Sequence, residues 1–278
     1  MGLYNPMKIA FMTGTGLAGF ENILTNIVKH KDAYNKFGKI VVYYEGEYNG
    51  LQVVILPRHG TKEEFRTPTT LAKQNGYEAN IYLLHELGVQ AIFATSAVGA
   101  MDPGTSLVDK GSFVIPHTYI RWFASTQHSF GQLAKEEHPN TSNPFNQELR
   151  RKVIEIIRSI GLSAQDEGIY IYNGGDQFET SAEINFLNKM AEGKNRVIGM
   201  TTVPEAVLTL QMKIPFVVIC CPTNYAEGVC GTKVEHQNHV DIMKPMQENM
   251  GKIFKAILDS YSQGNPSPEG ISFHAPEY

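Results

Sequence analysis

The chain has 278 residues, of which 42% are hydrophobic, and its formal net charge at pH 7 is -4. A chain of this length buries a substantial apolar core, and we expect one large domain. Its 24 basic residues are interspersed with 28 acidic ones, so no basic stripe is present to neutralise a nucleic-acid backbone. No apolar run approaches the roughly 20 residues that span a bilayer, and the start of the sequence is not that of a signal peptide. We therefore expect a cytoplasmic protein that binds neither nucleic acid nor membrane.

The sequence contains three cysteines, Cys220, Cys221 and Cys230. They cannot all pair with one another, and none has the spacing of a CxxC motif or of a Cys/His zinc site. This pattern favours a reducing compartment. It predicts neither a structural metal nor a redox cofactor.

Apolar, β-rich runs bounded by Gly, Pro, Asn or Asp predict strands at 8–12, 40–44, 53–56, 91–94, 112–115, 168–172, 197–200 and 215–221. Stretches with helical period predict helices at 71–87, 146–160, 182–191, 204–212 and 239–261. Strands that alternate with helices favour an α/β fold. The strands at 40–44 and 53–56 are typical of a hairpin, so we expect a mixed central β-sheet flanked by helices. We assign the domain to residues 1–262 and interpret residues 263–278, rich in Pro, Gly and Ser, as a loose surface tail.

A glycine-rich turn follows the first predicted strand. Residues 13–19, TGTGLAG, formally match GxGxxG, a pattern that seats dinucleotides when a parallel βαβ unit places an acidic residue at the end of its second strand. Here a hairpin follows instead, and Glu45 is a poorly placed candidate for that acid. A bare glycine turn with the Thr15 hydroxyl also suits a smaller anion such as phosphate. A plain tight turn is the third interpretation.

Two further strand ends carry groups that suit an anion. Arg58 and His59 follow the strand at 53–56, and a guanidinium there can grip an anion bidentately, although each side chain alone is more often a salt-bridge partner or a structural histidine. The strand at 91–94 continues into small residues, TSAVGA, which either expose N–H and hydroxyl groups or allow close packing. Three such ends in one sheet favour a shared phosphate pocket.

Two later motifs give the chain a family resemblance. Residues 174–183, GGDQFETSAE, resemble the purine-site signature of the trimeric nucleoside phosphorylases, and residues 199–205, GMTTVPE, resemble their second signature. Thr223 and Asn224 follow the next strand, where that family has its base-recognising residue. With TGTGL, RHG and SAVG, the resemblance runs from about residue 8 to 260. The family covers purine nucleoside phosphorylases and the methylthioadenosine and methylthioinosine phosphorylases, and the resemblance implies a homotrimer.

The resemblance also implies a role for each matched position. Phosphate would be held by Thr15, Arg58, His59, the backbone at Ser96 and Ala97, and Thr201. The nucleoside would be held by Phe178 on the base, Met200 under the ribose, Glu179 and Asn224 at the purine edge, and His239 at the 5′-hydroxyl. Of these, we expect Asn224, Glu179 and His59 to act in catalysis. Taken singly, Phe178 and Met200 also fit ordinary core, while Glu179 and His239 fit helix starts. No cofactor is implied, because inorganic phosphate would be a co-substrate.

The residue pair at the purine edge bears on the substrate. Cleaving an N-ribosidic bond makes the ribose cationic and the purine anionic, so the site must stabilise both charges in the transition state. Phosphate held beside C1′ would supply the nucleophile and stabilise the cation. Glu179 can accept a hydrogen bond from N1–H of a 6-oxopurine, whereas adenine offers a bare N1, and in the family asparagine at the Asn224 position accompanies 6-oxopurines. The sequence therefore predicts reversible phosphorolysis of inosine or guanosine to the free base and ribose 1-phosphate.

Some features favour other assignments. The RHG motif and residues 138–145 resemble the methylthioadenosine branch, so a methylthionucleoside phosphorylase is the alternative, and a non-catalytic nucleotide-binding protein is a more distant one. Asp176 and Gln177 stand where the family usually has Pro followed by Arg or Ser, and the role of Asp176 is open. Gly76 and Glu78 also depart from the family's Asn-Tyr-Arg-Ala-Asn run.

Overall fold

The computed structural model describes residues 7–14, 20–102, 108, 111–123, 128–230 and 239–262, with only the backbone of 123 and 239–245. The elements of these residues are, in chain order, β1 (Lys8–Thr13), η1 (Phe20–Ile23), β2 (Thr25–Asn35), β3 (Gly38–Tyr48), β4 (Leu51–Pro57), α1 (Pro68–Lys73), α2 (Gly76–Glu86), β5 (Ala91–Ala100), β6 (Phe113–Phe123), η2 (Gly131–Leu133), α3 (Gln147–Ser159), β7 (Ala164–Asn173), α4 (Ser181–Met190), β8 (Lys194–Gly199), α5 (Thr202–Gln211), β9 (Phe216–Tyr225) and α6 (His239–Ser262). Among them, no helix combines the length and apolar character needed to cross a membrane.

The central strands are apolar on both faces. β1 pairs in parallel with β4 and β5, and β5 pairs in parallel with β9. Successive side chains of a strand face opposite sides of the sheet, so Ala10 and Met12 belong to one buried cluster while Ile9 and Phe11 belong to another. This double burial explains why these strands are continuous apolar runs in the sequence.

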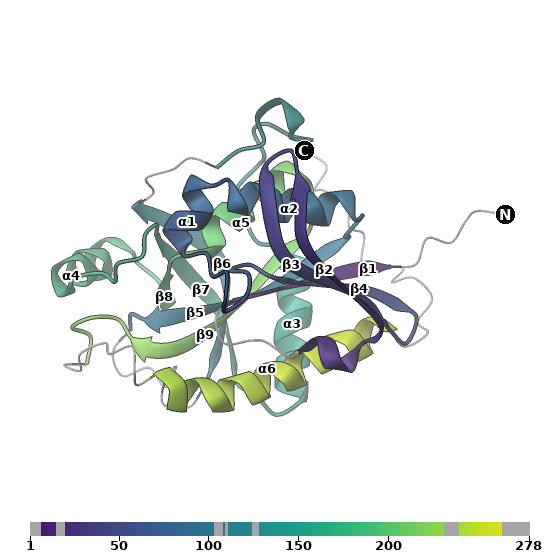
Figure 1. Ribbon diagram of the computed structural model, residues 1–278. Helices are drawn as coiled ribbons and strands as arrows, with labels where there is room; N and C mark the ends of the chain where they lie inside the picture. Colours follow the sequence, from purple (N-terminus) through teal and green to yellow (C-terminus); the bar gives the residue numbers. More distant parts are fainter. Residues whose placement is uncertain are drawn as a thin grey trace.

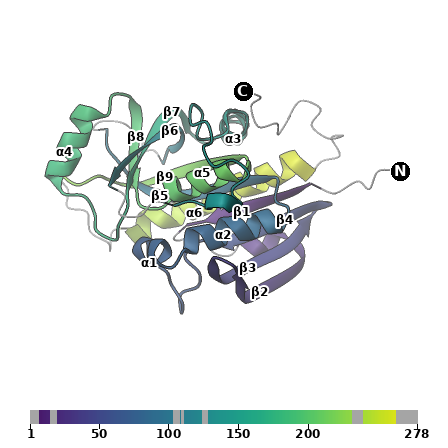
Figure 2. The ribbon, with the colours of Figure 1, turned by 90° about the horizontal axis from the view of Figure 1, so that it is seen from above.

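Helices cover both faces of the sheet (Figures 1 and 2). α2 and α5 contribute to the cluster that contains Ala10, and α3 and α6 contribute to the cluster that contains Phe11. The ring of Phe254 in α6 lies 4.3 Å from that of Phe11, measured between centroids. α4 covers β7 and β8 through Ile184 and Leu187. The described elements thus form one mixed α/β unit.

The sheet closes on itself at one end. Its strand order is β2-β3-β4-β1-β5-β8-β7-β6-β9, with an additional pairing of β5 and β9, so the strands from β5 to β9 form a ring. β5 and β8 pair only near their carboxyl ends, Gly99 with Ile198 and Ala100 with Val197. Gly99 also pairs with Asn224 of β9. The closure brings the carboxyl ends of β5, β8 and β9 together.

The predicted elements overlap observed ones, and the predicted hairpin is confirmed as the antiparallel pair β3–β4. The single helix expected over 71–87 is wrong, because Asn75 has a φ of 52° in the left-handed region and separates α1 from α2. β2 was not predicted, since it is largely exposed along its length and has no buried face. The proposed tail at 263–278 lies outside the described residues.

Candidate active site

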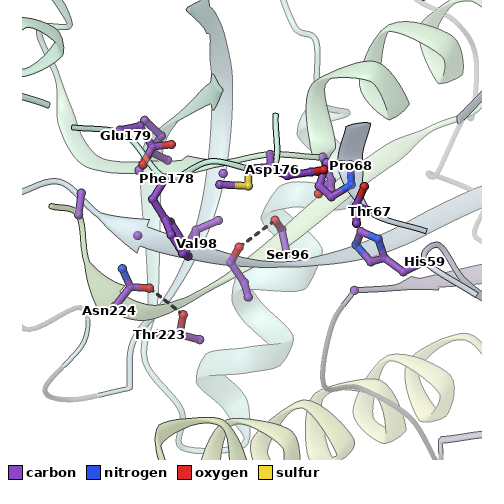
Figure 3. Close-up of a pocket in the computed structure, with 18 of the residues that line it drawn as sticks. His59, Thr67, Pro68, Ser96, Val98, Asp176, Phe178, Glu179, Thr223 and Asn224 are labelled. Carbon is purple, nitrogen blue, oxygen red and sulfur yellow. Dashed lines mark hydrogen bonds between the residues drawn. The ribbon is translucent and has the colours of Figure 1, made fainter. Parts of the chain in front are cut away.

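A cavity of about 360 Å³ opens where the strand ends converge (Figure 3). Its walls come from the ends of β1, β4, β5, β8 and β9 and from the segment between β7 and α4. Among the residues that line it are Arg58, His59, Ser96, Ala97, Phe178, Glu179, Met200, Thr201 and Asn224, all of which the sequence singled out. Thr15 and the side chain of His239 lie outside the described part of the chain.

Arg58 is only 1% exposed, and most of its guanidinium is engaged by the protein. Nε and Nη2 donate to the two carboxylate oxygens of Glu205, at 2.9 Å for Nη2, and Nη1 donates to the Thr95 carbonyl at 2.6 Å. Burial alone would lower the pKa of Arg58, but the Glu205 carboxylate raises it, so the guanidinium stays charged. The bidentate edge that the sequence assigned to an anion is therefore occupied by Glu205. One hydrogen on Nη1 and one on Nη2 remain available to a ligand.

His59 is held as a neutral ring of one tautomer. Its Nδ1 lies 2.7 Å from the Arg66 carbonyl, which only accepts, so Nδ1 carries the hydrogen and Nε2 the lone pair. Burial and, to a smaller extent, the neighbouring Arg58 cation together lower the pKa of His59 to about 4. The Phe65 ring stacks on the imidazole with centroids 5.0 Å apart. His59 thus offers an acceptor, not a cation.

Small residues and hydroxyls complete this end of the cavity. A Cβ added to Gly14 would lie 2.7 Å from Arg58 Nη1, so only glycine lets the chain pass so close to the guanidinium. The hydroxyl of the fully buried Tyr170 lies 3.4 Å from Ser96 Oγ and 3.5 Å from Thr201 N. Thr201 precedes α5 without capping it through its side chain. Backbone N–H groups at a helix start and a spare hydroxyl suit an anion.

The opposite end of the cavity presents a carboxylate and an amide (Figure 3). Glu179 is 7% exposed, and its Oε1 accepts from Asn173 Nδ2 at 3.0 Å; burial raises the pKa of this carboxyl. Asn224 Nδ2 donates to the Tyr225 carbonyl at 2.8 Å, while Oδ1 accepts from Thr223 Oγ1 at 3.1 Å. These bonds fix which way the amide faces and leave one hydrogen and one lone pair for a ligand.

Other lining residues were not assigned by sequence reasoning. Phe65, Thr67 and Pro68 line the cavity. In the sequence, a Thr-Pro pair indicates only the start of a helix. Thr67 does cap α1, because its side chain accepts a hydrogen bond from Thr70 N. Asp176 also lines the cavity, and its Oδ1 accepts from Thr69 N at 2.9 Å. Phe145, from the segment that resembled the methylthioadenosine branch, is fully buried core beside Phe216.

The family model described as the phosphorylase superfamily matches residues 8–259. The chain belongs to the phosphorylase superfamily. This phosphorylase is 32% identical over 260 residues to the 6-oxopurine nucleoside phosphorylase of Pyrococcus furiosus, covering 90% of the chain and 92% of the relative. It is also 32% identical over 253 residues to the S-methyl-5′-thioadenosine phosphorylase of Pyrococcus horikoshii, covering 90% and 91%. The family resemblance seen in the motifs is confirmed.

The fold of this phosphorylase is shared with solved structures. Methylthioadenosine phosphorylase from Schistosoma mansoni, in complex with adenine, matches with a TM-score of 0.79 at 20% identity and 93% coverage of each chain. A methylthioadenosine phosphorylase from an antarctic soil metagenomic library matches with a TM-score of 0.78 at 23% identity, covering 94% of this chain and 88% of that one. At these identities the likeness concerns the fold, which agrees with the α/β architecture expected from the sequence.

Proposed function

We propose that the protein is a purine nucleoside phosphorylase that cleaves inosine or guanosine with inorganic phosphate, reversibly, to the free base and ribose 1-phosphate. The observation that carries this proposal is one cavity with two chemically different ends. Arg58, His59 and Thr201 form an end that suits an anion, and Glu179 and Asn224 form an end that suits a purine edge. The name of the Pyrococcus furiosus relative supports the same substrate class.

At the anion end, the protein holds phosphate in place for attack on C1′. The free Nη hydrogens of Arg58, the Thr201 hydroxyl and the backbone at Ser96 and Ala97 donate to phosphate oxygens. His59 Nε2 accepts, so it binds a protonated phosphate oxygen or a ribose hydroxyl. Holding the nucleophile in line removes much of the entropic cost of the encounter, and the bound anion stabilises the ribosyl cation.

At the purine end, two side chains respond to the charge that leaves with the base. The free hydrogen of Asn224 Nδ2 donates to the N7 and O6 edge, and this bond strengthens as the purine gains electrons. Glu179 accepts from N1–H, which a 6-oxopurine has and adenine lacks. Phe178, 44% exposed at the rim, stacks on the base.

A methylthionucleoside phosphorylase is the second candidate, because the S-methyl-5′-thioadenosine phosphorylase of Pyrococcus horikoshii has the same 32% identity to the chain.

We also propose a cytoplasmic homotrimer that acts in purine salvage. Two exposed apolar side chains on α4, Phe186 at 46% and Met190 at 66% exposed, support a covered face on this helix. Light scattering that gives the mass of one chain would contradict the trimer.

The test is the release of free base from inosine, guanosine, adenosine, 5′-methylthioadenosine and 5′-methylthioinosine, each with and without phosphate. We expect cleavage of inosine or guanosine only when phosphate is present. Preference for a methylthio substrate would transfer the protein to the second candidate. Absence of cleavage of all five would refute a phosphorylase activity.

A further inference from the structure

Asp176 places a carboxylate on the cavity that the mechanism above does not use. It lies in the segment between β7 and α4, is exposed to solvent and lines the cavity. Its Oδ1 accepts a hydrogen bond of 2.9 Å from Thr69 N in the first turn of α1, a backbone group without an intrahelical partner. The segment that carries Phe178 and Glu179 is thus tied to the wall that carries Thr67 and Pro68.

This carboxylate lies between the two ends of the cavity. Figure 3 shows Asp176 next to Pro68 and Thr67, on the same side as His59 and across from Asn224. Asp176 is close enough to His59 for its charge to oppose the fall in the pKa of that ring. In the sequence it stands only two residues before Phe178. A ligand that spans phosphate and base therefore has its ribose beside Asp176.

The chemistry of a carboxylate narrows what it binds there. An ionised carboxylate only accepts hydrogen bonds and has about four acceptor positions, of which Thr69 N uses one. It repels the phosphate anion, and Glu179 already faces the N–H of the base. In inosine, the remaining hydrogen-bond donors are the ribose hydroxyls. In a β-ribonucleoside the 2′- and 3′-hydroxyls lie on the face from which phosphate attacks, so they are the hydroxyls nearest the His59 end.

We propose that Asp176 is a specificity-determining residue whose tethered carboxylate accepts a hydrogen bond from the 2′- or 3′-hydroxyl of the nucleoside. This inference rests on the proposed function. The Thr69 bond holds the carboxylate in place before substrate arrives, so little side-chain freedom is lost on binding. When the sugar lacks the accepted hydroxyl, the Asp176 carboxylate faces the cavity without its hydrogen-bond partner. The enzyme therefore has a lower kcat/KM for that nucleoside.

The test compares inosine with 2′-, 3′- and 5′-deoxyinosine as substrates for the wild type, Asp176→Ala and Asp176→Asn. We expect Asp176→Ala to lower kcat/KM for inosine and for 5′-deoxyinosine by about ten- to hundredfold. For the analogue that lacks the hydroxyl accepted by Asp176, which is either 2′- or 3′-deoxyinosine, the substitution should leave kcat/KM nearly unchanged. Asp176→Asn keeps an acceptor for Thr69 N without the charge, so its discrimination should be intermediate. An equal fall for all four substrates, or no fall for any, overturns the proposal.

Glu192→Ala is the matched control, because it removes an exposed carboxylate that does not line the cavity, and it should keep the wild-type preference. Calorimetric binding of the same four nucleosides without phosphate separates the two proposals. If the wild type binds nucleosides with the expected hydroxyl preference but cleaves none, only the proposed reaction fails. If it cleaves inosine but Asp176→Ala shows no change in preference, only the role of Asp176 fails. If it neither binds nor cleaves any nucleoside, both are refuted.

Discussion

Arg58 and Glu205 form a buried, bidentate ion pair that ties the end of β4 to the first turn of α5. Both side chains are 1% exposed, and they are 147 positions apart in the sequence. Thr201, just before α5, and His59, just after Arg58, both line the cavity. The pair therefore fixes two walls of the anion end relative to one another, and the geometry of that end depends on a contact deep in the fold.

Removing Glu205 should destabilise the protein strongly. Glu205→Ala leaves the Arg58 cation buried without its anion, and breaking a buried pair in this way costs about 3–5 kcal/mol. Glu205→Gln keeps one acceptor oxygen and should cost less. Urea unfolding at neutral pH measures both values. A loss below about 1 kcal/mol for Glu205→Ala would mean that Arg58 finds another partner or remains hydrated.

The role of Arg58 in phosphate binding can be separated from its role in folding. Arg58→Ala alone should raise the phosphate requirement and slow turnover, but it also leaves the Glu205 carboxylate buried without its cationic partner. The double substitution Arg58→Met with Glu205→Met removes both charges, and such replacements are often neutral for stability. We expect a folded protein whose KM for phosphate is at least about tenfold higher, the loss typical of a charge-assisted hydrogen bond. Unchanged phosphate dependence would remove Arg58 from the site.

His59 should make the protein less stable in mild acid. Its pKa is lowered from 6.5 to about 4 by burial and by Arg58, so the unfolded chain binds a proton at this residue before the folded chain does. The stability is complete above about pH 6.5 and is lost as the pH falls towards 4. Between pH 7 and pH 5 the loss is about 2 kcal/mol. It is measured as the free energy of unfolding at the two pH values.

The control is His59→Asn, which can still donate to the Arg66 carbonyl but does not titrate. Its loss of stability between the same two pH values should be smaller than that of the wild type by about the same 2 kcal/mol. Equal pH dependence in the two proteins would show that His59 is protonated as easily in the folded state as in the unfolded one.

The sequence predicts where the strands lie and which residues line the cavity, but it does not predict which side chains pair with one another. β1, β4, β5 and β9 are apolar on both faces, so each is visible as a short run, and the functional residues follow where those runs end. The exposed strand β2 has no such pattern. Nothing local in the sequence indicates that Glu205 takes the bidentate edge of Arg58, because that pairing depends on how β4 and α5 pack.

Asn224→Asp should shift preference from inosine towards adenosine. An aspartate accepts from the 6-amino group but cannot donate to O6 or N7 unless protonated. The structure adds a cost, because Asn224 Nδ2 now donates to the Tyr225 carbonyl, and a carboxylate oxygen there would face another acceptor. We expect kcat/KM for inosine to fall by at least about tenfold and the inosine to adenosine ratio to fall with it. An unaltered ratio would refute this account of base selection.

Gly199 and Tyr170 should behave as a coupled pair behind the anion end. A Cβ at position 199 would clash with the Tyr170 hydroxyl and lie 2.9 Å from Tyr170 Cζ. Gly199→Ala must therefore displace a fully buried ring whose hydroxyl lies within 3.5 Å of Ser96 Oγ and Thr201 N. We expect it to cost about 1–3 kcal/mol of stability, as overpacking does, and to raise the KM for phosphate.

Tyr170→Phe removes the atom that clashes, so it should restore part of the stability and phosphate affinity that Gly199→Ala loses. The coupling between the two substitutions, measured by urea unfolding and by the KM for phosphate, should be about 0.5–3 kcal/mol. Recovery is expected to be partial, because the ring carbon stays near the added methyl group. Strictly additive effects of the two substitutions would show that Tyr170 does not set the position of Ser96 and Thr201 from behind the cavity wall.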